Sequence, residues 1–434
     1  MKKARLWVVW GLVLGCSACR APSLRYKYEV NKLVAAGQFE KADELVVAKQ
    51  HRMYGKKDSL LFALDRSSLL HDAQQPQQSD ALLASAQQQI TDSYTKSVSA
   101  SAARVLINDL TTPYYAADYE TALTFFYRAL NFLQQQDVMS AAVEARKAVF
   151  FLDHLRGRKK SGYNDDPFVQ YVASLVFESA GEVSDARIAR QNALNAYQRR
   201  GWPVPSFAVP SNAQDYGELI LFHYTGQVPL KKSQTIQVGW DHILTYANTP
   251  VEDGGPISPE AVNAITAGLA GSSVTVAYPV LESQPYIVHS SMLSVNGTRI
   301  PLQKMSDVSE LVAQDLDAKL PGIWFRLATR AVLKRVAAVQ ARHAVESSSE
   351  NTNMGFLAEM LVGVLGAATE KADTRQWFTL PARVNMARVF VSPGTYTLRL
   401  LLQDENGNIV GEHTFQNVTV RKGARLFLHH RTAY

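Results

Sequence analysis

Two groupings of polar residues could carry out nucleophilic or acid–base chemistry. Ser93 and Lys96 have a Ser-x-x-Lys spacing, but the companion Lys-Thr-Gly and Ser-Asp-Asn elements are absent from the sequence. Asp165 and Asp166 are adjacent carboxylates that could act as a general acid and base. Pro167 follows them, and proline is common at the first position of a helix. We therefore expect Asp166 to be a helix N-cap rather than a catalytic group.

Metal binding is the third kind of chemistry to consider. Ten histidines are scattered through the chain, and only His429 and His430 are adjacent. Neighbouring side chains of a strand point to opposite faces, so these two imidazoles would not share an ion. The His-Glu-x-x-His, P-loop, Gly-x-Gly-x-x-Gly and Gly-x-Ser-x-Gly signatures do not occur. The sequence thus predicts no catalytic residue, no cofactor and no metal site.

Cysteine chemistry is concentrated near the N-terminus, since Cys16 and Cys19 are the only thiols in the chain. They follow an apolar run, Leu6–Gly15, which is preceded by the basic residues Lys2, Lys3 and Arg5. A basic flank, a short apolar run and small residues are typical of a secretory signal. The run is too short to cross a bilayer, which needs about 20 apolar residues. We expect residues 1–15 to be a signal peptide.

The stretch Val13-Leu14-Gly15-Cys16 resembles the lipobox of bacterial lipoproteins. The resemblance implies that Cys16 is acylated, for instance with palmitate, and becomes the mature N-terminus. Cys19, after Cys16-Ser17-Ala18, is a second candidate, and a plain cleaved leader is the alternative. By the lipoprotein sorting pattern, Ser17 implies the outer membrane, with the protein facing the periplasm.

Composition describes an ordinary globular protein, with 47% hydrophobic and 19% charged residues. The 434 residues suffice for two or three domains of about 150 residues each. The formal charge of +6 is spread over the whole chain. Nucleic-acid binding calls for a concentrated basic stripe, so we do not expect a nucleic-acid partner.

Between residues 26 and 199 one unit recurs: a helix with apolar periodicity, a polar or glycine break, and an Ala-rich helix. Gly181 is expected in the break of the last unit, where glycine accepts a positive φ. Small residues that would let the paired helices approach recur at intervals of 37, 62 and 45 residues, namely at Ala42, Ser79, Ala141 and Ala186.

This pattern resembles the tetratricopeptide repeat, although the intervals vary and the usual first-helix tryptophan is missing. It implies that residues 16–200 form an irregular α-solenoid of about four helix pairs. A helical bundle is the alternative. Stacked helix pairs form a concave surface that commonly holds a peptide or partner protein, so an envelope protein or peptide is the expected partner there.

Gly201-Trp-Pro-Val-Pro205 marks a boundary, after which the sequence changes to strand-like patterns. Residues 201–345 are expected to be a mixed strand and helix domain. Asn296-Gly297 predicts a hairpin turn within 292–300. The other strands are predicted at 218–224, 235–240, 274–278 and 286–290, and separate amphipathic helices are predicted at 306–319 and 323–344.

Residues 346–434 are expected to be an apolar helix, 356–368, followed by a small β-sandwich-like module. Its predicted strands are 382–391, 395–402, 409–420 and 425–430, which are joined by turn residues. The whole chain is therefore predicted to be of the α+β class: a helical repeat half, a mixed region and a strand-rich tail.

The arrangement resembles an uncharacterised family of proteobacterial lipoproteins with tetratricopeptide-like repeats. The stretches Asn164–Tyr171 and Ala372–Trp377 carry the resemblance. It implies a membrane-anchored, non-catalytic protein–protein interaction scaffold, with a role in cell-envelope assembly or peptidoglycan synthesis. The alternative is an envelope hydrolase, acting on peptidoglycan or a surface polymer, whose active site the sequence hides.

Overall fold

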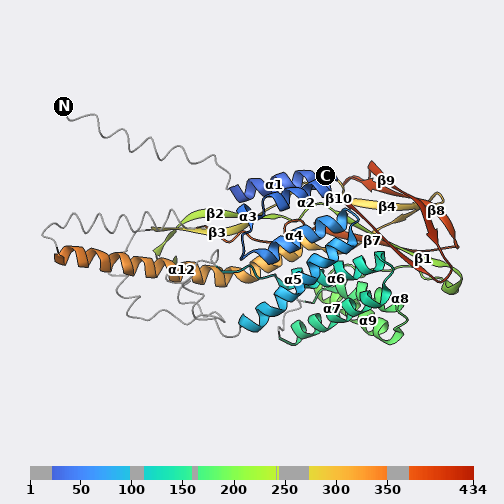
Figure 1. Ribbon diagram of the computed structural model, residues 1–434, viewed down its shortest axis with the longest axis horizontal. Coiled ribbons are helices and arrows are strands. Elements are labelled where there is room, and N and C mark those ends of the chain that lie inside the picture. Colours follow the sequence, from blue (N-terminus) through green and yellow to red (C-terminus); the bar gives the residue numbers. More distant parts are fainter. Residues whose placement is uncertain (1–21, 98–111, 159–164, 241, 244–272, 349–370) are drawn as a thin grey trace, which may run out of the picture.

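The computed structural model describes residues 22–97, 112–158, 165–240, 242–243, 273–348 and 371–434 (Figure 1). Helices occupy the N-terminal half and strands dominate the C-terminal part, so the α+β class is confirmed. Cys16, Cys19 and the expected helix 356–368 lie outside the described residues. Within the described residues, no helix has the length and apolar content that a membrane span requires.

Helices of the N-terminal half follow one another in pairs, and the two members of each pair pack together. A short helix, α3, lies between the first and second pairs. The helices are α1 (Pro22–Ala35), α2 (Phe39–Ala48), α3 (Gln50–Met53), α4 (Ser59–Asp72), α5 (Pro76–Ser97), α6 (Asp118–Gln134), α7 (Val138–Arg158), α8 (Pro167–Ser179) and α9 (Val183–Arg200).

Each pair contains the same turn between its two helices. Gly37, Gln74, Gln136 and Gly181 have φ values of 60–76°. In every turn the N–H of this residue bonds to the carbonyl three residues earlier, and the next N–H bonds to the carbonyl five residues earlier. This is the hydrogen-bond pattern of a Schellman C-cap. The expected position of Gly181 in a break is confirmed. The predicted small residues lie five positions after each turn residue, and all are buried: Ala42, Ser79, Ala141 and Ala186.

The described strands of the C-terminal part form two four-stranded sheets and a two-stranded ribbon. One sheet has the order β10-β1-β7-β6, in which β1 and β10 are parallel and the other pairs are antiparallel. The second sheet has the order β5-β4-β8-β9, and β2 pairs with β3. The strands are β1 (Gly217–Thr225), β2 (Leu230–Gly239), β3 (Ser273–Glu282), β4 (Ser290–Val295), β5 (Thr298–Pro301), β6 (Gln303–Asp307), β7 (Arg383–Val391), β8 (Gly394–Gln403), β9 (Ile409–Val420) and β10 (Arg425–Thr432). A short 3-10 helix, η4 (Ala213–Asp215), precedes β1.

The two four-stranded sheets pack on each other through a shared apolar core. Strands before and after residue 346 contribute to both sheets, so the tail does not form the separate sandwich that the sequence suggested. β7 inserts between β1 and β6, and β8 pairs with β4. The expected domain boundary at 345/346 would therefore cut across both sheets. Strand pairing between distant segments leaves no local pattern in the sequence, which explains the error.

Local predictions in this part had mixed outcomes. The hairpin is confirmed, because Asn296 and Gly297 have φ values of 47° and 83° between β4 and β5. The predicted strand 286–290 is wrong, since only Ser290 belongs to a strand. The two helices predicted at 306–319 and 323–344 are one helix, α12 (Val308–Ser348), which continues through Pro321. The proline removes one backbone hydrogen bond but does not end the helix.

The first helix of each of the last three pairs faces the sheet that contains β1. α6 contacts β10, and α8 contacts β6. The rings of Phe126 and Phe168 lie 5.8 and 6.2 Å from the ring of Phe222 on β1, and the ring of Tyr127 lies 5.7 Å from that of Trp377. The molecule thus has three layers there: helices, the β1 sheet and the β4 sheet.

Candidate functional site

Both carboxylates of the Asp165–Asp166 pair have structural partners. Asp166 is the N-cap of α8, and its side chain accepts hydrogen bonds from the N–H groups of Phe168 and Val169 at 3.0 and 3.1 Å. The predicted cap is confirmed. The buried Asp165 forms an ion pair with Arg199. The two groups therefore stabilise the start of α8 rather than face a substrate.

Ser93 and the adjacent histidines His429 and His430 lie in different parts of the structure. Ser93 lies on α5 and donates a hydrogen bond to the carbonyl of Gln89 at 2.7 Å. His429 stacks on His71 of α4, whereas His430 stacks on His413 of β9. The two adjacent imidazoles thus point to opposite faces of β10.

A buried group that the sequence did not reveal places His71, Asp72 and His429 together, with ligand atoms within 4.8 Å of one another. The His71 and His429 rings are nearly parallel, at 17°, with centroids 4.0 Å apart. A zinc ion must lie about 2.0–2.1 Å from each ligating nitrogen, where the lone pair in the ring plane points. Stacked rings direct these lone pairs side by side, so this arrangement does not form a metal site.

Hydrogen bonds account for the imidazole nitrogens of this group instead. The Nδ1 of His71 lies 2.7 Å from the Oδ1 of Asn131, and its Nε2 lies 3.3 Å from the Tyr224 hydroxyl. Burial lowers the pKa of His71 to about 4. The neutral ring then donates from Nδ1 and accepts at Nε2, which matches its two neighbours. The group joins α4, α6 and the β1 sheet.

A chain segment before β7, residues 372–380, lies against the helices and receives many of their polar contacts. Asp65 of α4 accepts from the Phe378 N–H at 3.1 Å, and Glu120 of α6 accepts from the Trp377 N–H at 2.9 Å. The indole N–H of Trp377 donates to the Ser68 hydroxyl at 3.1 Å. Trp377 is fully buried. The helical half therefore already holds a segment of its own chain, which we call the plug (residues 372–380).

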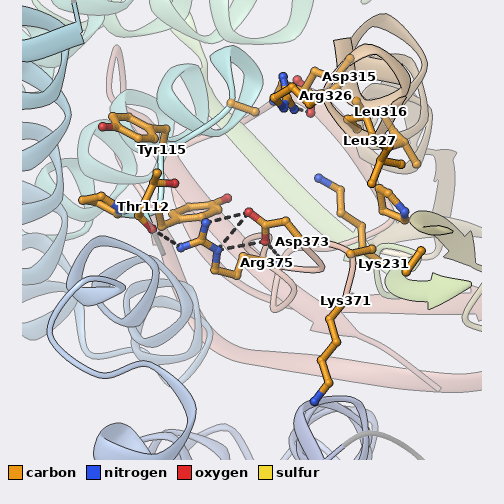
Figure 2. Close-up of a pocket in the computed structure, with 18 of the residues that line it drawn as sticks. Thr112, Tyr115, Lys231, Asp315, Leu316, Arg326, Leu327, Lys371, Asp373 and Arg375 are labelled. Atoms are coloured by element: carbon orange, nitrogen blue, oxygen red, sulfur yellow. Dashed lines mark hydrogen bonds and ion pairs between the residues drawn. The ribbon is translucent and has the colours of Figure 1, made fainter. Parts of the chain in front are cut away.

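A cavity of about 260 Å³ lies where the plug begins (Figure 2). Its walls come from the residues before α6, from β2 and β3, from α12 and from the start of the plug. Tyr115 lies on one wall with its side chain 41% exposed, and α12 forms another. The cavity is slightly smaller than the roughly 300–1,000 Å³ pockets that hold drug-sized ligands. It has room for a small ligand or for the end of a larger one.

Cationic side chains outnumber carboxylates around this cavity. The lining carboxylates are Glu120, Asp315 and Asp373. The six lining cations are Lys231, Lys319, Arg326, Arg330, Lys371 and Arg375. Figure 2 shows the Lys231 side chain extending toward Asp315 and Arg326, whereas Lys371 extends the other way. The lining thus contains more cationic than acidic side chains, which favours an anionic ligand.

Each lining carboxylate is engaged by the protein itself. Glu120 accepts from the Tyr114 hydroxyl at 2.6 Å and from two backbone N–H groups at 2.8 and 2.9 Å. Asp315 accepts from Lys319 at 2.8 Å. Asp373 pairs with Arg375, and the guanidinium of Arg375 also bonds to Asp58 at 2.6 Å. Carboxylates held in this way support the cavity walls and are poorly placed for proton transfer.

No motif in the sequence points to the residues of this cavity as a group. Lys231 lies in an ordinary strand pattern, and Arg326 lies in an ordinary amphipathic helix. The only signal was the stretch Ala372–Trp377, which stood out through the family resemblance and contains Asp373 and Arg375. Its polar residues are explained by the contacts of the plug.

Comparisons with known proteins add no identification, because no family model, no curated protein and no solved structure matches the chain.

Proposed function

We propose that the protein is a lipid-anchored lipoprotein of the cell envelope that acts by binding a partner, without catalysis. The four helix pairs are proposed to be tetratricopeptide-like repeats of an irregular solenoid. The repeated turn at Gly37, Gln74, Gln136 and Gly181 supports this assignment. Scaffolds of this kind present a concave surface, and fold analogy suggests the same use here.

The observation that carries the proposal is the cavity at the start of the plug. Most of the inner face of the helices is covered by the β1 sheet and the plug. A partner therefore cannot bind along that face as it would in an open repeat array. The cavity lies beside the covered inner face. Its lining carboxylates form hydrogen bonds or ion pairs with other groups of the protein. We therefore propose that a peptide or loop of an envelope protein enters at the cavity. A role in envelope assembly or peptidoglycan synthesis remains a proposal from the family resemblance.

Site-specific crosslinking tests the binding proposal. A photo-crosslinking amino acid at Tyr115, on the cavity wall, should join the protein to one defined partner in detergent-solubilised membranes. The same amino acid at Asn406, in the exposed turn between β8 and β9, is the matched control and should give no such product. Equal products at both positions, or none at Tyr115, would contradict the proposal.

The enzyme alternative, an envelope hydrolase, makes a different prediction. Asp315→Asn and Asp373→Asn remove a carboxylate but keep its size. Because both carboxylates support the walls of the proposed binding cavity, a scaffold variant that loses function in cells should also lose partner capture. A folded variant that captures the partner yet behaves like a deletion would point to a hydrolase.

Anchoring is tested separately at the proposed lipidation site. Cys16→Ala should abolish palmitate labelling and release the protein from the membrane fraction, because stable attachment requires the acyl chains. Cys19→Ala is the control and should leave both unchanged. If only Cys19→Ala abolished labelling, the second cysteine would be the acylated one.

A further inference from the structure

Within the described residues, two lining cations have side chains without a hydrogen bond or ion pair: Lys371, which extends away from Asp315 and Arg326 (Figure 2), and Lys231. It lies on β2 and is half-buried, and its side chain extends into the cavity (Figure 2). Its backbone N–H bonds to Gln376 of the plug at 2.8 Å, which fixes the strand at this point. This hydrogen bond fixes the backbone from which the Lys231 side chain extends into the cavity.

Burial makes this position unfavourable for an ammonium ion. Burial lowers the pKa of Lys231, and the charge of Lys319 lowers it further, although Asp315, Glu120 and Asp373 act in the opposite direction. Those three carboxylates are held by other donors. A bound anion would supply a negative partner that stabilises the Lys231 ammonium.

The adjacent residue of the same strand, Lys232, is a lysine with an ion-pair partner and a partly exposed side chain. Lys232 points to the other face of the strand, as neighbouring strand residues do. Its ammonium lies 3.4 Å from Glu282 and its side chain is 40% exposed. The two lysines thus differ in surroundings while sharing a strand, and Lys232 is a matched control.

We propose that the cavity is an oxyanion-binding site, in which Lys231 contacts a carboxylate or phosphate group of the ligand. Arg326 and Arg330 of α12 also line the cavity and add positive charge. The inference rests on the proposed binding function and specifies its chemistry: the partner presents an anionic end group to the cavity. A volume of about 260 Å³ suits such an end group better than a folded domain.

Thermal unfolding and calorimetric titration of the full chain in detergent test this proposal. The probes are inorganic phosphate and a short peptide with a free C-terminal carboxylate, with the amidated peptide and sodium chloride as controls. We expect phosphate, the acidic peptide or both to raise the melting temperature. The probe that raises the melting temperature more shows whether the site prefers a phosphate or a carboxylate. The amidated peptide and chloride should have no comparable effect.

Variants assign the effect to Lys231. Lys231→Met should weaken binding of the active anion at least about tenfold, as expected for loss of a charged hydrogen bond. Lys232→Met should bind like the unmodified protein, and Lys231→Arg should retain most of the affinity. In the absence of anion, Lys231→Met should melt at the same or a higher temperature, because it removes a poorly compensated charge. A cooperative thermal transition in this measurement also shows that the variant folds.

Three results would overturn the proposal: no anion effect on the unmodified protein, the same affinity in Lys231→Met, or the same loss in Lys232→Met. The crosslinking experiment at Tyr115 is scored independently. If the partner is captured but no anion binds, the binding function stands and the oxyanion site is rejected. If an anion binds through Lys231 and no partner is captured, the site stands and the scaffold function is rejected.

Discussion

Asp65 connects the two halves of the molecule through one buried carboxylate. It accepts from the Tyr54 hydroxyl at 2.9 Å and from the Phe378 N–H at 3.1 Å. Burial raises the pKa of Asp65, while the hydrogen bond from Tyr54 and the charge of Lys27 act to lower it. The geometry requires an acceptor at this point, because a buried N–H without one is costly.

We predict that Asp65→Ala lowers the free energy of unfolding by about 2–4 kcal/mol, since the Tyr54 hydroxyl, the Phe378 N–H and the Thr379 hydroxyl each lose an acceptor. Asp65→Asn keeps one acceptor oxygen for the Phe378 N–H, so it should lose clearly less. Urea unfolding at pH 7, followed by tryptophan fluorescence, gives both values. Equal losses in the two variants would mean that the carboxylate charge matters more than its hydrogen bonds.

His71 makes the stability of the fold depend on pH. Burial lowers the pKa of His71 to about 4, below the usual histidine value of 6.5. Between these values the unfolded chain binds the proton and the folded protein does not, so stability falls as the pH drops from 6.5 toward 4. The loss attributable to His71 should reach about 2 kcal/mol by pH 5.

This prediction is checked by comparing the free energy of unfolding at pH 7 and pH 5. His71→Gln should show a pH-dependent loss that is smaller by about 2 kcal/mol than in the unmodified protein. His51→Gln changes an exposed histidine and should leave the loss unchanged. Identical losses in all three proteins would contradict a buried neutral His71.

At the scale of elements, the repeated turn between paired helices requires one residue with a positive φ, and this conformation costs free energy unless the residue is glycine. Two of the four turns place glutamine, not glycine, at a positive φ: Gln74 and Gln136. A residue with a Cβ is disfavoured in this conformation. At Gly181, a Cβ would meet no atom within 4 Å, so the backbone alone decides the cost of a substitution there.

We predict opposite effects for exchanges at two equivalent turns. Gly181→Ala should lower the free energy of unfolding by about 1 kcal/mol, and Gln136→Gly should raise it by up to about 0.5–1 kcal/mol. Gln136 is exposed, so its side chain contributes little packing. Chemical denaturation of both variants measures the difference. Destabilisation by Gln136→Gly would show that its side chain matters more than the backbone.

The sequence predicted those elements whose signals are local. Helix periodicity, the cap at Asp166, the break at Gly181 and the hairpin at Asn296-Gly297 were all read correctly. It failed where the outcome depends on distant partners. The sharing of strands between sheets was missed, and so was the cavity around Lys231, whose walls come from separate segments. The prediction of two separate helices on either side of Pro321 was also wrong, because tertiary packing can stabilise a helix that contains a proline.

At the scale of the whole molecule, the helical half and the strands form one interlocked unit. Lys27 of α1 donates to the Thr374 carbonyl at 2.6 Å, and His429 of β10 stacks on His71 of α4. Phe126 and Phe168 are almost completely buried against Phe222. The inner face of the helices is thus part of the common core, which differs from an open solenoid with a free concave surface.

The helical half should therefore be unstable by itself. A fragment of residues 22–200 would expose Phe126, Tyr127 and Phe168 to water, at about 1.5–3 kcal/mol for each large apolar side chain. It would also leave the buried carboxylates of Asp65 and Glu120 without the plug's N–H donors. We expect a fragment that is helical by circular dichroism but melts without a cooperative transition and associates on size exclusion.

Adding a second fragment, residues 201–434, should restore a cooperative transition if the two halves fold together. Trp377→Ala in the second fragment is the control, because it removes the largest fully buried side chain of the plug and should weaken reassembly. A monomeric 22–200 fragment with a sharp transition would instead mean that the repeats fold as an independent solenoid. Its concave face could then be released from the plug, and the partner site would extend over the whole inner surface of the helices rather than ending at the cavity.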